Sequence, residues 1–246
     1  MAGIIIRLFL FLLLLNSARA QDRSSCPAEP HTLYSAGAVS LDAASGMRIR
    51  LASPDHTKVL LVNRVEDPKD PDGMHINYLA RVGRKTFKTS LLGFNGEVAW
   101  AADSKAFVVT QTEGGGGLGS RVYVFFVDEK GITKIDVSRA IEKAFGNPVR
   151  CEVEVPPNTG FVAWKRGSSE LLVAAEVVPV SICHCSGTYR VYDIKLPGVT
   201  IVEVYSQESA KKKFWDALGC ELRSADDRCV KQLESRFRRG GTKQNR

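Results

Sequence analysis

The sequence has few of the local patterns that mark catalytic or nucleotide-binding sites. No G-x-S-x-G segment is present, and no motif places two acids or a nucleophile beside His31, His56 or His75. The glycine run Gly114–Gly117 is not followed by Gly-Lys-Ser/Thr, so a flexible connection is favoured over a phosphate-binding loop. The sequence therefore gives no positive evidence for an enzyme, and it predicts no catalytic residue and no cofactor.

Long hydrophobic runs are also missing. The apolar stretch 4–15 has twelve residues and is interrupted by Arg7, whereas a transmembrane helix needs about 20. Ala18-Arg19-Ala20 follows it and has the form that signal peptidase cleaves, so residues 1–20 are predicted to be a signal peptide. The residue directly after the predicted cleavage site is Gln21 rather than cysteine, which argues against a lipid anchor. We expect a periplasmic or extracellular protein with no membrane span after cleavage.

The six cysteines all lie beyond that leader. An even number in an oxidising compartment predicts disulfides. Cys220 and Cys229 flank a short segment between two helical patterns, and we expect them to be joined. For Cys183 and Cys185 three states stay open: disulfides to Cys151 or Cys26, a soft metal held together with His184, or free thiols. Disulfides are favoured because neighbouring side chains of an extended segment point to opposite faces, so no metal site is predicted.

One pattern occurs three times in the chain. Residues 51–62, 99–109 and 163–173 each read as a strand, a tight polar turn and a second apolar strand. The turns contain Pro54-Asp55, Asp103-Ser104 and Gly167-Ser168, which are residue types that favour chain reversal.

The similarity of the three copies continues downstream. Each copy goes on to an alternating strand, a glycine turn and a fourth strand. Gly83, Gly131 and Gly198 lie 31, 31 and 34 residues after Ala52, Trp100 and Trp164 respectively. We therefore expect a mainly β protein of antiparallel four-stranded meander repeats, with Trp100 and Trp164 at equivalent, buried positions.

These repeats resemble the WD-repeat-like blades of TolB-type exported β-propellers. The signature is split among the copies, since Ser53-Pro54-Asp55 stands in the first while Trp100 and Trp164 stand in the others. The resemblance implies a β-propeller-like fold, but three copies are fewer than the four to eight blades that usually close a ring. Strand material at 33–40 is a candidate for part of another blade. We therefore expect the sheets either to form an open stack or to close into a ring by self-association.

Outside the repeats the sequence predicts helices. Residues 136–148 place Val137, Ile141 and Phe145 on one helical face. A C-terminal helical hairpin is expected within 208–239, with its second helix beginning near Ser224, and 240–246 is expected to be a disordered tail. The N-terminal segment is 21–46 and the repeats span 47–207.

The basic residues are concentrated at the C-terminus. The net charge is +7, and from Glu208 onward eleven Lys or Arg stand against six Asp or Glu. This tail either contacts an acidic surface or forms a solvated helical face. Nucleic acid is not an expected partner, because no recognisable binding motif is present.

These features favour an exported, non-catalytic binding or scaffolding module that contacts another protein of the cell envelope. The alternative is an envelope-polymer hydrolase whose site is assembled from distant loops.

Overall fold

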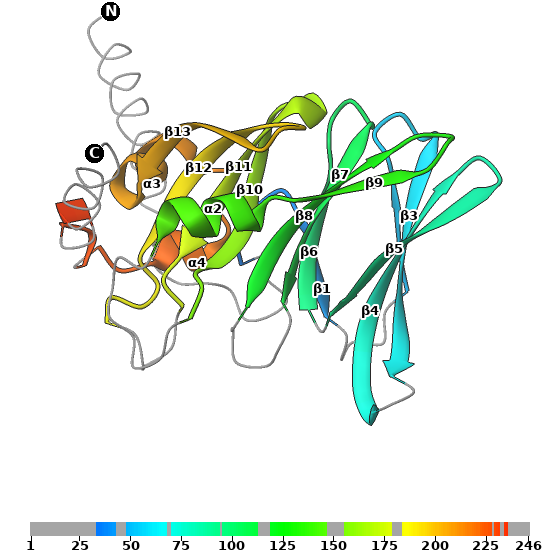
Figure 1. The fold of residues 1–246 in the computed structure, drawn as a ribbon, viewed down its shortest axis with the longest axis horizontal. Coiled ribbons are helices and arrows are strands. Elements are labelled where there is room, and N and C mark those ends of the chain that lie inside the picture. The colour runs from blue at the N-terminus through cyan, green and yellow to red at the C-terminus, as the bar shows by residue number, and fades with distance from the viewer. Residues whose placement is uncertain are drawn as a thin grey trace, which may run out of the picture.

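Figure 1 shows a computed structural model of the chain, which describes residues 33–42, 48–67, 70–93, 95–112, 119–146, 155–178, 184–227, 229–231 and 234–235. The predicted signal peptide, Cys26, Cys151, Cys183 and the predicted tail 240–246 lie outside these residues. No helix in the described part of the chain is long and apolar enough to cross a membrane.

The predicted fold class is confirmed, because the described chain forms three antiparallel sheets. Blade 1 consists of β2 (Ile49–Ala52), β3 (Lys58–Asp67), β4 (Asp70–Val82) and β5 (Lys85–Gly93). Blade 2 consists of β6 (Asn95–Trp100), β7 (Ala106–Thr112), β8 (Ser120–Val127) and β9 (Ile132–Asp136). Blade 3 consists of β10 (Asn158–Arg166), a single 3-10 turn at Gly167–Ser169, β11 (Glu170–Glu176), β12 (Tyr189–Lys195) and β13 (Thr200–Ser206). Each blade is a meander of sequential strands, as the repeat predicts.

The first two strands of every blade share one register. Ala52 pairs with Val59, Trp100 with Phe107, and Trp164 with Leu171, so the paired residues are seven apart in each copy. In an antiparallel pair the register decides which side chains share a face. Residues at equivalent positions of the three copies therefore point to equivalent faces of their blades.

The blades pack face to face in a row (Figure 1). Alternate residues of blades 1 and 2 meet in one apolar core that includes Leu60, Tyr78, Phe107 and Phe125, all buried. A second core, between blades 2 and 3, includes Val124 and Leu171. Two separate cores between three sheets explain why blade 2 is apolar on both faces.

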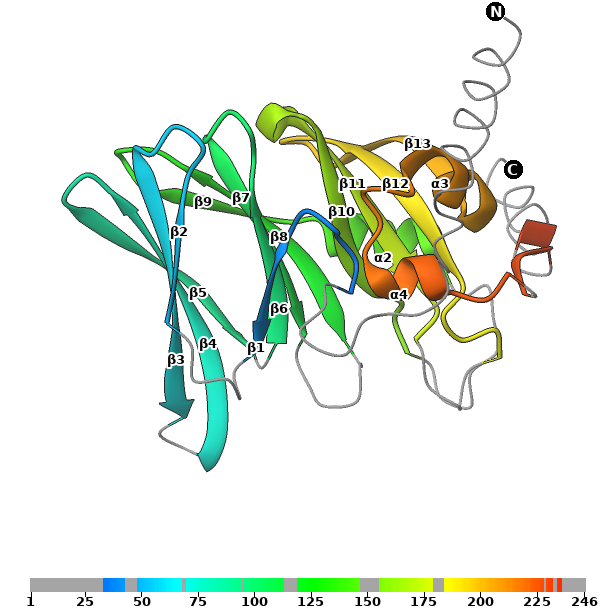
Figure 2. The ribbon, with the colours of Figure 1, turned by 180° about the vertical axis from the view of Figure 1, so that it is seen from behind.

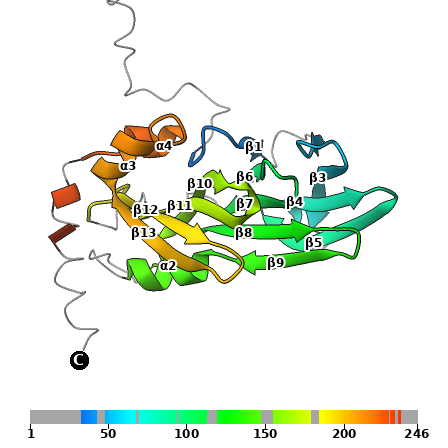
Figure 3. The same ribbon diagram turned by 90° about the horizontal axis from the view of Figure 1, so that it is seen from above.

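In the described residues, helices α2, α3 and α4 flank the row. Helix α2 (Ser138–Phe145) buries Ile141 and Phe145 in the core between blades 2 and 3, as the predicted helical face requires, and it ends at Gly146 with φ of 64°. Helices α3 (Gln207–Phe214) and α4 (Cys220–Ser224) cover the side of blade 3 that faces away from blade 2 (Figure 3).

Helix α4 ends at Ser224, so it is an additional helix before the predicted one, in whose expected apolar face Val230 is helical. Gly219 is extended and precedes the first residue of α4, and its N–H donates to the carbonyl of Tyr34 at 2.7 Å. The same glycine that stops the preceding segment therefore opens the next helix. Leu233, in the predicted apolar face, lies outside the described residues.

Residues 33–42, here called the strap, run along the inner strands of blades 2 and 3. Their strand β1 (Val39–Asp42) pairs antiparallel with β6 of blade 2, as Figure 2 shows. The expectation that this segment contributes to another blade is therefore wrong. The exposed edge of β6 offers unpaired backbone groups, and the strap satisfies them.

Candidate functional site

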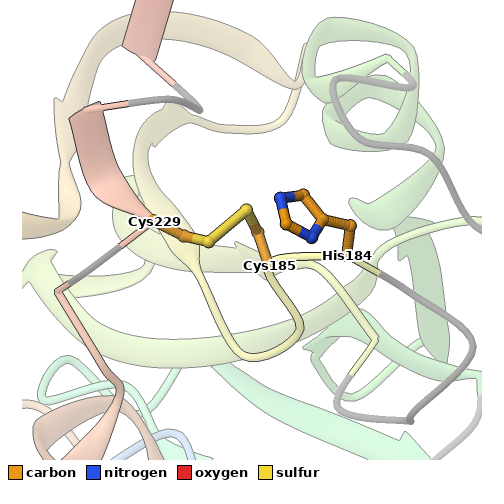
Figure 4. A group of neighbouring side chains, drawn as sticks. All are labelled: His184, Cys185 and Cys229. Carbon is orange, nitrogen blue, oxygen red and sulfur yellow. A yellow bond between two sulfur atoms is a disulfide. The ribbon is translucent and has the colours of Figure 1, made fainter.

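The Cys-His cluster of the sequence is a disulfide in the structure. Cys185, in the loop before β12, is bonded to Cys229 with a Cα–Cα distance of 5.4 Å. His184 is exposed, and its ring lies beside the two sulfurs, with the ligand atoms of the three residues within 4.8 Å of one another (Figure 4). Because both thiols are consumed in the bond, this group of residues is a covalent staple between blade 3 and the C-terminal segment.

The predicted Cys220–Cys229 bridge is wrong, and so is the expected pairing of Cys185 with Cys151 or Cys26. Cys220 is also disulfide-bonded, but not to Cys229. Cys220 stands at the first position of α4, whereas Cys229 lies near the loop that carries Cys185. The packing of α4 against the strap separates Cys220 from Cys229, although the two are close in the sequence.

The aspartates of the repeated turns connect neighbouring blades. The backbone N–H of Asp55, in the turn of blade 1, donates to Ser104 Oγ in the turn of blade 2 at 2.9 Å. Asp103 of blade 2 accepts from the N–H and the Oγ of Ser168 in blade 3, at 3.0 and 2.8 Å. Each serine thus reaches back to the aspartate turn of the preceding blade, and the three turns form one directional series.

The carboxylates of these turns are held by hydrogen bonds. Those from Ser53 and Thr57 hold the pKa of Asp55 well below its usual value. Partial burial raises the pKa of Asp103, but the hydrogen bonds from Ser168 together with the N–H and charge of Lys105 outweigh it, and the net shift is downward. Both groups are therefore charged acceptors with structural partners.

In blade 3 the aspartate position of the turn is Gly167. A Cβ there would come 2.8 Å from the carboxylate of Asp103, and the residue has φ of 48°, which favours glycine. The series of turns therefore ends at blade 3.

The structure places the two repeat tryptophans at equivalent ends of inner strands, where both rings are half-buried. Trp100 packs edge-on to Phe107 with centroids 5.2 Å apart, and its Nε1 donates to the carbonyl of Leu51 in blade 1. Trp164 packs on Phe161 with centroids 5.6 Å apart, in the core between blades 2 and 3. Each ring thus faces the preceding blade.

The inner edge of the row holds buried acids that sequence reasoning did not find. Glu97 of β6 is 3% exposed and accepts hydrogen bonds from the backbone N–H groups of Leu33 and Tyr34 in the strap. Burial raises the pKa of Glu97 to about 7, and the amide donors oppose that shift. The Tyr34 hydroxyl contacts Ser120 Oγ at 3.0 Å and donates to Glu176 Oε2 at 3.2 Å.

Glu176 is fully buried at the end of β11, and burial raises its pKa well above the usual value. In general, carboxyl groups that line a cleft and have raised pKa values are candidates for acid–base chemistry. Here Glu97 and Glu176 bind the strap, so a structural role accounts for their position.

No element that the structure describes covers the outer face of blade 1, which points away from blade 2. Strand alternation and register place one row of side chains across its four strands: Arg50, Leu61, Leu79 and Lys88. A neighbouring row contains Ala52, Val59 and Arg81. The leucines are half-buried, and Arg50, Arg81 and Lys88 are exposed.

This face is the counterpart of the face with which blade 2 packs on blade 1. By the shared register Arg50 occupies the position of Val98, Leu61 that of Val109, and Arg81 that of Phe125. The three blade 2 residues are at most 1% exposed. Blade 1 therefore keeps a blade-packing surface with an apolar centre, in which cations replace two of the buried apolar residues.

The opposite end of the row is closed. The outward face of blade 3 buries Leu172, Val191 and Tyr205 beneath α3 and α4. Figure 3 shows these helices at one end and blade 1 at the other, where no described element lies beyond it. The asymmetry marks the outer face of blade 1 as the candidate binding surface.

Sequence reasoning singled out none of the residues of that face. The signal that could have found them is a comparison of the three copies position by position, because Arg50 and Arg81 are charged where blades 2 and 3 have apolar residues.

Comparisons with known proteins identify no family for this chain. No family model matches it, and no curated protein matches it. One matching solved structure is an acylaminoacyl peptidase of Pyrococcus horikoshii, with 11% sequence identity and a TM-score of 0.35 over 68% of this chain. The matched part is 26% of the peptidase chain, so the present chain spans about a quarter of that protein.

Proposed function

We propose that this chain is an exported, non-catalytic binding module that holds a protein partner of the cell envelope on the outer face of blade 1. The observation that carries the proposal is the unequal treatment of the two ends of the row. The chain covers the outward face of blade 3 with its own helices, whereas no element that the structure describes covers the outward face of blade 1, with Leu61 and Leu79 at its centre.

Three further features support this function. The strap fills the inner edge, where Glu97 and Glu176 are engaged in holding it. The Cys185–Cys229 disulfide suits an oxidising compartment, in keeping with the predicted signal peptide. The resemblance to TolB-type propellers implies binding rather than catalysis.

Site-specific photo-crosslinking tests the proposal. A photoreactive residue at Leu79 should give one discrete adduct with an envelope protein in the producing cells. The same residue placed at Lys130, exposed in the turn between β8 and β9, is the matched control and should give none.

Two further results are required. Excess protein without the photoreactive residue should compete for the partner and lower the yield of the adduct, whereas excess Leu61→Asp variant should not lower it. No adduct at Leu79, or the same adducts at both positions, would contradict the proposed function.

A further inference from the structure

The outer face of blade 1 carries an unbalanced charge. Arg50, Arg81 and Lys88 surround its leucines, and Arg48 precedes β2 at the same side of the sheet. All four are exposed, and no acidic side chain that the structure describes lies in the two rows of this face. A partner must neutralise these cations as well as cover the apolar centre.

The turns of the repeat give a second, independent requirement. Ser104 and Ser168 each bond to the aspartate turn of the blade before them. The equivalent residue of blade 1 is His56, with φ of 60° against 59° at Ser104, so the two backbones match. His56 is exposed, and no blade precedes blade 1 in the part of the chain that the structure describes.

From these two observations we propose that the partner docks as a preceding blade would, laying an acidic sheet face on blade 1 and an acidic turn against His56. The proposal rests on the proposed function and names the chemistry of its partner. The acidic groups pair with Arg50, Arg81 and Lys88, while apolar residues between them cover Leu61 and Leu79.

A second copy of this chain fits that surface less well. Two blade 1 faces brought together would oppose cation to cation, and the face of blade 3 is already covered by α3 and α4. A membrane surface would satisfy the charges but would not use the turn position of His56. An acidic protein sheet satisfies all three features.

The first experiment titrates the isotopically labelled protein with a disulfide-cyclised hairpin peptide. One face of the hairpin alternates valine and glutamate, with an Asp-Gly turn; the control hairpin has lysine for glutamate. The acidic hairpin should shift the amide resonances of Leu61 and Leu79, and its affinity should fall as salt is raised. The lysine hairpin should leave these resonances unchanged.

Charge reversal then localises the binding. Arg81→Glu and Lys88→Glu should each weaken the acidic hairpin by about fivefold, since each removes one surface pair and adds a repulsion. Lys130→Glu is the matched control and should have no effect. The Arg50→Glu/Arg81→Glu/Lys88→Glu variant should instead bind the lysine hairpin, which a misfolded protein would not do. His56→Asp should weaken binding and His56→Ser should preserve it.

Equal binding of both hairpins, or no binding of either up to about millimolar concentration, would overturn the inference. An effect of Lys130→Glu equal to that of Arg81→Glu would also overturn it. So would dimerisation that Leu79→Asp abolishes, or binding to phosphatidylglycerol vesicles alone. A crosslinked envelope partner without hairpin binding would refute the acidic chemistry and leave the proposed function standing. Hairpin binding without any crosslinked partner would do the reverse.

Discussion

Tyr34 is the residue on which the docking of the strap depends most. It is 2% exposed, and its ring lies so close to Gly160 of β10 that a Cβ on the glycine would come 1.9 Å from the Tyr34 Cγ. Tyr34→Ala removes this ring and leaves Glu176 and Ser120 without their phenol partner. Loss of a buried aromatic costs about 3–5 kcal/mol. This is a large share of the free energy of unfolding of a typical domain, which is about 5–15 kcal/mol.

Urea unfolding measures that loss, and three further variants separate its causes. Tyr34→Phe keeps the ring and should cost only about 1–2 kcal/mol, for the lost hydrogen bonds. Gly160→Ala should destabilise because the Tyr34 ring has to move. Val39→Ala, on the exposed side of the same strap, should change stability by less than about 0.5 kcal/mol. If Tyr34→Ala and Gly160→Ala both unfold like the parent, the strap is not docked as described.

Three other predictions follow from the same structure. Because burial raises the pKa of Glu97 to about 7, the folded state holds this proton more tightly than the unfolded state does; stability should fall by up to about 3 kcal/mol between pH 4.5 and 7, and urea titrations of Glu97→Gln should show a flatter profile. A double-mutant cycle of Asp103→Ala and Ser168→Ala should give a coupling of about 1–2 kcal/mol in thermal unfolding, and additive effects would show that the turns are not linked. Peptide mapping without reduction should recover Cys185 bonded to Cys229, and replacing both by serine should cost up to about 4 kcal/mol, as estimated from the 44-residue separation.

The repeat could be predicted from the sequence because its information is local. Ala52, Trp100 and Trp164 stand at one register position, and the strand-turn-strand pattern that surrounds them lies within about a dozen residues. The same holds for Ile141 and Phe145, whose helical spacing and glycine stop define α2.

The contacts that complete the fold could not be predicted in the same way. Cys185 and Cys229 are 44 residues apart, and their pairing depends on where blade 3 and the C-terminal segment meet. Glu97 is a single acid in an alternating strand, and nothing near it in the chain indicates that the amides of residues 33 and 34 will reach it. The outer face of blade 1 could be predicted in part. Its residues lie close together in the sequence, but their role as a candidate binding surface is recognised only when blade 1 is compared with blade 2.

The route of the strap has a consequence for the order in which the chain can fold. Gly219 donates to the carbonyl of Tyr34, Ala36 donates to the carbonyl of Ala217, and Ser35 forms a bridge with Leu218. These contacts of the strap can therefore form only after residues 217–219 have been synthesised, whereas its pairing with β6 and the packing of Tyr34 on Gly160 need only earlier segments. Blades 1 and 2 are built from sequential hairpins and can form as they emerge, and the C-terminal segment adds the last contacts of the strap. A chain stopped before residue 217 would keep the contacts of the strap with blades 2 and 3 and lose those with the C-terminal segment, so that segment completes the docking of the strap.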